Sequence, residues 1–174
     1  NCSNVRWLKR HTRGFENIKK SDNTTELICL INSTEMPLTA SINRMYLQLT
    51  SLVKDIVSVL EGDDIELLSD ADEREAEVDA LLYLVARQVC IALDSHLVST
   101  ALKIGRNQAV EFSNLARALE RMMDHALQMA DLVKSADEVS MDANKAPMIH
   151  LFVWQKSIKQ LMINIRTRYA YELK

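Results

Sequence analysis

Two pairs of acidic residues have a spacing that could bind a metal ion. Glu75 and Asp79 lie four residues apart, and Glu120 and Asp124 repeat this spacing. In a helix, residues four apart lie one turn apart on the same face. Carboxylate oxygens on two neighbouring helices form a hard ligand set that suits iron, manganese or magnesium. The spacing therefore makes these four residues candidate metal ligands.

Salt bridges are the alternative explanation for these carboxylates. Two like charges one helical turn apart repel each other, so each pair needs a cation nearby. Four arginines are close enough in sequence to supply it, namely Arg74, Arg87, Arg117 and Arg121. Ion-pair networks commonly explain such acidic clusters, so the spacing alone leaves both interpretations open.

Other patterns that indicate an enzyme are missing from the sequence. A di-iron oxidase needs Glu-x-x-His on its helices, but His125 lies five residues after Glu120. The sequence also has no Ser/His/Asp order, no P-loop and no glycine-rich dinucleotide turn. We therefore expect no catalysis. The alternatives are a carboxylate-bridged metal enzyme and a purely structural dimerisation bundle.

The composition predicts an all-α protein. Of 174 residues, 48% are hydrophobic and 5% are aromatic, with three Gly and two Pro. Few helix breakers favour long helices over a β-sandwich. The net charge of −3 argues against nonspecific nucleic-acid binding by the whole chain.

The cysteines and the hydropathy pattern indicate a cellular compartment. Cys2, Cys29 and Cys90 are far apart, which excludes a zinc knuckle and suits a reducing cytoplasm. No apolar run approaches the ~20 residues that a membrane span needs. We expect a cytoplasmic protein. Because the chain begins without Met and stops within a helical pattern, we interpret it as a piece of a longer protein.

Four helices are expected to position the acidic residues. The first should begin near Leu38 and end at the break Glu61-Gly62-Asp63; the others should cover 65–98, 107–134 and 147 to the chain end. Short links between long helices favour an antiparallel bundle. On the first helix the expected buried residues are Ile42, Met45, Leu49, Leu52, Ile56, Val59 and Leu60. On the second they are Val78, Leu82, Val85, Val89 and Leu93. On the fourth they are Ile149, Val153, Ile158, Leu161 and Ile165.

A basic segment precedes the helices. Residues 1–13 are expected to form a short helix or a frayed end. The apolar runs 15–18 and 27–31 flank a polar stretch and predict a weak β-hairpin. We divide the chain into a connecting segment at 1–36 and a helical bundle at 37–174.

Three segments resemble the PhoU family of phosphate-uptake regulators. Residues 113–133 read SNLARALERMMDHALQMADLV, which is similar to the signature helix of that family. Residues 72–88 read DEREAEVDALLYLVARQ and are similar to its partner helix, while Asn43-Arg-Met-Tyr46 matches its first helix. The segments occur in the family's order and together cover about residues 40–135.

The resemblance implies a fold of two tandem three-helix bundles. This chain would hold the first bundle, and the helix from residue 147 would open the second. Archaeal members carry an AbrB-like DNA-binding domain before the helices, which this sequence does not include. We therefore expect contact with DNA only through that missing domain.

The resemblance also implies the ligands and partners of the protein. The family's metal motif, Glu/Asp-x-x-x-Asp, carries over to Glu75/Asp79 and Glu120/Asp124, with His125 as a weaker ligand candidate. The implied cofactor is iron or another divalent metal such as manganese, magnesium or zinc. The implied partners are a phosphate ABC transporter ATPase or a sensor histidine kinase. We expect a homo-oligomeric regulatory adaptor that responds to phosphate.

Overall fold

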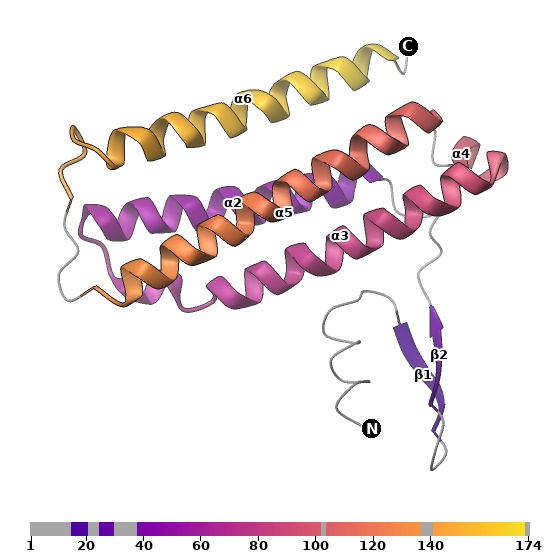
Figure 1. The fold of residues 1–174 in the computed structure, drawn as a ribbon, viewed down its shortest axis with the longest axis horizontal. Helices are drawn as coiled ribbons and strands as arrows, with labels where there is room; N and C mark the ends of the chain where they lie inside the picture. Colours follow the sequence, from indigo (N-terminus) through magenta and orange to yellow (C-terminus); the bar gives the residue numbers. More distant parts are fainter. Residues whose placement is uncertain (1–14, 21–24, 30–37, 102–103, 137–140, 173–174) are drawn as a thin grey trace.

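The computed structural model describes residues 15–20, 25–29, 38–101, 104–136 and 141–172. The side chains of the strands, and those of a few residues near Val98 and after Thr167, lie outside this description. The predicted all-α fold is confirmed: long helices form an antiparallel bundle, and a two-stranded hairpin lies apart from it (Figure 1). The helix or frayed end expected at 1–13 falls outside the described residues.

Helix α2, Leu38–Glu61, forms as expected. All seven side chains that its apolar periodicity predicts to be inside are buried. Gly62 ends the helix with φ of 114°, a conformation that suits glycine because it has no Cβ. The Gly62 N–H donates to the Val59 carbonyl and the Asp63 N–H donates to the Ser58 carbonyl, each at 3.0 Å. This pair of bonds is a Schellman motif, which satisfies carbonyls at the helix end.

The single helix predicted over 65–98 was wrong, because the structure divides it into three pieces. These are the 3₁₀ helix η1, Ile65–Leu68, and the helices α3, Ala71–Asp94, and α4, His96–Ala101. Asp64 caps η1 by accepting a hydrogen bond from the Glu66 N–H at 2.9 Å. The backbone of Ser95 is extended, with φ of −122° and ψ of 116°. Asp and Ser favour helix ends over helix interiors, and Ser69, Asp70 and Ser95 stand at the two breaks.

Helix α5, Arg106–Lys134, packs with α2 and α3 into a three-helix bundle. Its buried side chains include Phe112, Leu119 and Met123 together with four alanines. On α3 the buried stripe runs through Val78, Leu81, Val85 and Val89, while Leu93 is 38% exposed. The predicted inward position of Leu93 was therefore wrong, whereas Leu82 packs against the core. The stripe turns slightly about α3, which leaves Leu82 half-buried at its edge.

Helix α6, Met148–Glu172, lies along α2 on the outside of the three-helix bundle (Figure 1). Met148, Ile158 and Met162 are its buried residues among those described. The predicted inward positions of three residues were wrong, since Ile149, Val153 and Leu161 are 44%, 59% and 39% exposed. Apolar residues are spread over all sides of the helix among polar ones, so its sequence pattern did not select one face.

Arg166 attaches the second half of α6 to α2. Its Nη2 and Nε donate to Oδ1 of Asn43 at 3.0 and 3.2 Å. Its guanidinium carbon lies 5.7 Å from the centre of the Tyr46 ring, within range of a cation–π interaction. These contacts fix the position of α6 along α2.

The predicted hairpin forms from β1, Phe15–Lys20, and β2, Thr25–Cys29. The strands are antiparallel, with Phe15 opposite Cys29 and an irregularity between Asn17 and Lys19. The division of the chain at residue 36 remains a prediction, because residues 30–37 are not described.

No helix within the described residues is long and apolar enough to cross a membrane.

Replacement of Phe112 by Ala should destabilise the bundle strongly. Phe112 on α5 is 2% exposed in the core of the bundle, and truncation of such a ring leaves a cavity. We expect the free energy of unfolding to fall by about 3–5 kcal/mol. Leu132→Ala on the same helix, where the side chain is 70% exposed, is the control and should change stability by less than about 0.5 kcal/mol. Equal effects of the two substitutions in urea denaturation would contradict this core.

Candidate metal site

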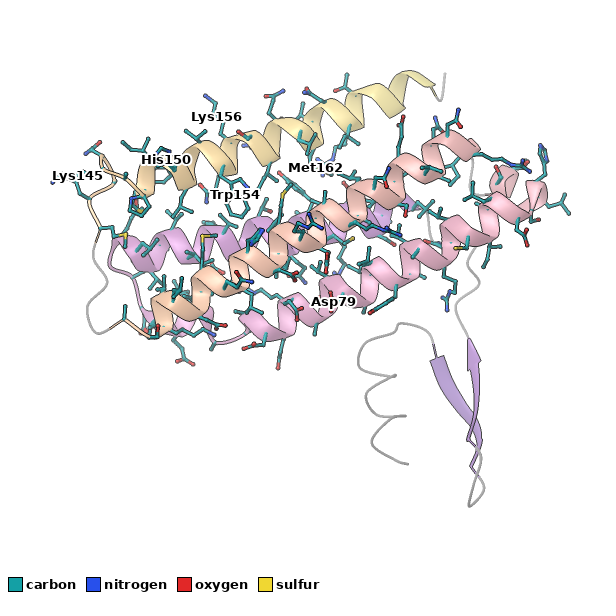
Figure 2. The ribbon with its side chains drawn as sticks, in the orientation of Figure 1. Asp79, Lys145, His150, Trp154, Lys156 and Met162 are labelled. Carbon is teal, nitrogen blue, oxygen red and sulfur yellow. The ribbon has the colours of Figure 1, made fainter. Side chains whose placement is uncertain are left out.

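The two acidic pairs lie along the contact between α3 and α5. Glu75 and Asp79 are half-buried on α3, and Glu120 and Asp124 are half-buried on α5. These two helices are the most extensively packed pair in the bundle. Figure 2 shows Asp79 on α3 where that helix runs alongside α5. The sequence pattern correctly placed all four residues at the edge of the buried stripes.

Glu120 shows that carboxylates of the two helices influence each other. Partial burial raises the pKa of Glu120, and repulsion from Asp124 and Asp79 raises it further. Arg121 opposes this shift. Because Asp79 belongs to α3 while Glu120 and Asp124 belong to α5, the fold brings acids from both predicted pairs into one negatively charged group. We call Asp79, Glu120 and Asp124 the carboxylate group.

Of the arginines expected to neutralise these acids, Arg74 pairs with other acids, and Arg121 acts on Glu120 through its charge. Arg74 binds Asp55 on α2, with 2.6 Å between Nη1 and Oδ2, and Asp70, with 2.8 Å between Nε and Oδ1. Within the described part of the chain, Glu120 and Asp124 form no ion pair. Glu75 and Asp79 each take part in a polar or electrostatic interaction. The salt-bridge explanation therefore remains open for the pair on α3 and finds no support for the pair on α5.

An acid that the sequence reasoning missed, Glu77, lies on the other flank of α3. It accepts a hydrogen bond from Arg44 Nε at 2.5 Å and another from the amide of Gln48. Its hydrogen bond raises the pKa of Arg44. Glu77 lies two residues from Asp79, so the alternation of the acids was a signal that they face different helices. Glu77 joins α3 to α2 by an ion pair, whereas Asp79 faces α5.

The chemistry of the carboxylate group suits a hard divalent cation, but its geometry is not that of a closed site. Carboxylate oxygens are the usual ligands of magnesium, manganese and iron. Among the described residues, however, no three acidic, His or Cys side chains stand close enough together to hold a metal ion. His125 is exposed on α5. Binding of a metal would require the carboxylates to move closer to one another.

A comparison with protein families decides what kind of protein carries this group. The PhoU domain model matches residues 42–133, from α2 to the end of α5. The match covers more than half of the 174 residues and includes all four candidate ligands. The chain belongs to the PhoU family. No curated protein and no solved structure matches the chain.

Membership in the PhoU family places the chain among regulators of phosphate transport. The family is regulatory and not enzymatic. The matched residues are those of the three-helix bundle, whereas the hairpin and α6 lie outside the match. The resemblance of α6 to the first helix of a second PhoU bundle remains a prediction.

Replacement of Glu120 by Gln should stabilise the PhoU bundle at neutral pH. A carboxyl group whose pKa is raised by folding destabilises the folded state when ionised, and this penalty disappears once the group is protonated. We expect Glu120→Gln to be more stable than wild type at pH 7 by roughly 0.2–0.5 kcal/mol, the size of a like-charge repulsion on a helix. The difference should vanish as the pH falls below the ordinary carboxyl pKa of 4.5.

The control is Arg121→Gln, which removes the opposing positive charge and should destabilise the bundle at pH 7. Urea denaturation at several pH values measures both variants. A stability difference for Glu120→Gln that is the same at pH 4 and pH 7 would contradict a charge repulsion at Glu120.

Proposed function

We propose that this PhoU protein is a phosphate-responsive adaptor that controls phosphate uptake by binding other proteins. The observation that carries the proposal is the match of α2–α5 to the PhoU domain. The partners would be a phosphate ABC transporter ATPase or a sensor histidine kinase in the cytoplasm. The surface for docking would be the polar outer face of the helices, and the adaptor would do no chemistry itself.

We propose further that the carboxylate group, together with Glu75, binds a divalent cation. The ion would be iron, or manganese, magnesium or zinc. The support is the position of these acids on the facing flanks of α3 and α5, where partial burial and then repulsion from Asp124 and Asp79 raise the pKa of Glu120. A cation would offset this repulsion. Because it would bind the folded bundle and not the unfolded chain, it would also stabilise the contact between α3 and α5.

The adaptor function is tested by deleting the gene and measuring phosphate uptake. We expect uptake in phosphate-rich medium to rise in the deletion strain and to return to normal when the gene is restored. The purified chain should also bind the purified transporter ATPase or the kinase. Unchanged uptake, with no binding to either protein, would contradict the adaptor function.

Metal binding is tested by titrating Mn²⁺ or Fe²⁺ into the purified protein. We expect saturable binding to wild type and at least roughly tenfold weaker binding to Glu75→Ala/Asp79→Ala, a loss of about 1.4 kcal/mol or more. Asp72→Ala/Glu73→Ala is the matched control, because it removes two exposed acids from the same helix and should leave binding unchanged.

Other outcomes of the metal experiment favour the alternative functions. If wild type and Glu75→Ala/Asp79→Ala bind the metal equally poorly, the bundle is a scaffold or a dimerisation module and not a metal protein. If the protein reconstituted with metal under anaerobic conditions shows reproducible turnover in an activity screen, the carboxylate group belongs to an enzyme.

A further inference from the structure

The turn between α2 and α3 carries a concentrated negative charge at one end of the bundle. Residues 56–73 contain no Lys or Arg. Four acids of the turn are exposed and form no ion pair with the described residues: Glu61, Asp63, Asp64 and Glu66. On the flank of α3, by contrast, Glu77 pairs with Arg44. Within the described chain, ion pairs therefore do not neutralise the charge of this turn.

Three large apolar side chains are exposed next to these acids. Ile65 and Leu67 lie between and beside them in the sequence and are 43% and 41% exposed. Met141 is 40% exposed, and its N–H donates to the Leu60 carbonyl at 2.9 Å, which places it beside the end of α2. We call residues 61–67 together with Met141 the acidic turn. Single exposed apolar residues are ordinary, but an apolar group with a charged rim is the usual arrangement of one half of a protein–protein interface.

The acidic turn has a fixed shape before any partner binds. Leu68 and Ala71, which follow it, are each 0% exposed and anchor it to the core. The 3₁₀ helix η1 packs against both α2 and α5. Asp64 accepts a hydrogen bond from the Glu66 N–H, which holds the start of η1. A surface that is already ordered loses little conformational entropy when it docks on another molecule.

Helix α6 does not cover the acidic turn. Figure 1 shows α6 starting at the same end of the molecule as the turn after α2 and then running along the side of the three-helix bundle. The acids and apolar side chains of the turn remain exposed with α6 in place. The surface is therefore accessible to a molecule that approaches this end of the bundle.

The charge of the acidic turn determines the chemistry of the molecule that it can bind. A carboxylate that loses its hydration in an interface weakens the complex unless it meets a cation. The phosphates of nucleic acids and the anionic surface of a membrane would be repelled. A fitting partner carries Lys or Arg side chains around an apolar centre, which describes a basic segment of a protein.

From these observations we propose that the bundle docks through the acidic turn on a Lys- and Arg-rich segment of its partner protein. Ile65, Leu67 and Met141 would contact apolar side chains of that segment, and the surrounding acids would pair with its cations. The inference rests on the proposed adaptor function, because it names the surface that the adaptor would use. It is separate from metal binding at the carboxylate group, which lies along the contact between α3 and α5.

Charge reversal of the acidic turn tests this docking. The variant is Glu61→Lys/Asp63→Lys, and the probes are the purified transporter ATPase and the purified kinase, each measured against the 174-residue chain by surface plasmon resonance. We expect wild type to bind one of the two proteins, and the variant to bind that protein at least roughly tenfold more weakly. Much of the loss should be in the association rate at low salt, because opposite charges speed the encounter of two proteins. High salt should weaken wild-type binding and reduce the difference between the two chains.

Two further variants separate this effect from a general change in charge. Asp94→Lys/Glu111→Lys makes the same charge change at exposed positions near the end of α3 and the start of α5, and it should bind as wild type does. Ile65→Ser/Leu67→Ser removes the apolar centre and should weaken binding at both low and high salt. Circular dichroism should show unchanged helix content in every variant, since all the substituted side chains are exposed.

The outcomes distinguish a failure of this proposal from a failure of the adaptor function. If wild type binds one of the proteins and Glu61→Lys/Asp63→Lys binds it equally tightly, the acidic turn is not the docking surface, but the adaptor function stands. If Asp94→Lys/Glu111→Lys loses as much affinity as the variant of the turn, the effect belongs to the net charge and the proposal is wrong. If wild type binds neither protein, the proposal and the adaptor function are both overturned.

Discussion

Close packing of α3 against α5 is the constraint on which the site depends. Half of the buried residues of α5 are alanines, and Ala109, Ala116, Ala126 and Ala130 are each 0% exposed. Small side chains let neighbouring helices approach closely. The flanks of the two helices are then also close, and they carry Asp79, Glu120 and Asp124. Burial of the apolar stripes thus holds like charges together that would separate if the helices were free.

The acids of α3 face two neighbouring helices, α2 and α5, and their electrostatic surroundings differ between the two. Toward α2, Glu77 pairs with Arg44, and the Arg74 side chain joins Asp55 to Asp70. Toward α5, Asp79 meets two further acids, and the ion pairs of the described chain do not include Glu120 or Asp124. Sites where local interactions oppose the fold are commonly functional. The contrast therefore distinguishes acids that join α3 to α2 by ion pairs from acids that repel one another between α3 and α5.

Much of the fold follows from the sequence, because periodicity and caps act locally. The buried face of α2 and the end of this helix at Gly62 could both be predicted directly from the sequence. The extended backbone at Ser95 was missed, since an apolar pattern continues across it. On α6, apolar residues on every side hid the face that packs. For the site, spacing placed each acidic pair on a helix flank. It did not reveal that Arg74 pairs with Asp55, because these residues are 19 apart and meet only when α2 and α3 pack.

The most direct test of the account is a double-mutant cycle between Asp79→Asn and Glu120→Gln, with the free energy of unfolding measured at pH 7 without added metal. If the two carboxylates repel each other across α3 and α5, each single substitution relieves the same repulsion. The double variant should then gain less stability than the sum of the two single gains. Strictly additive effects would show that the two side chains do not interact, and the proposed carboxylate group would not exist.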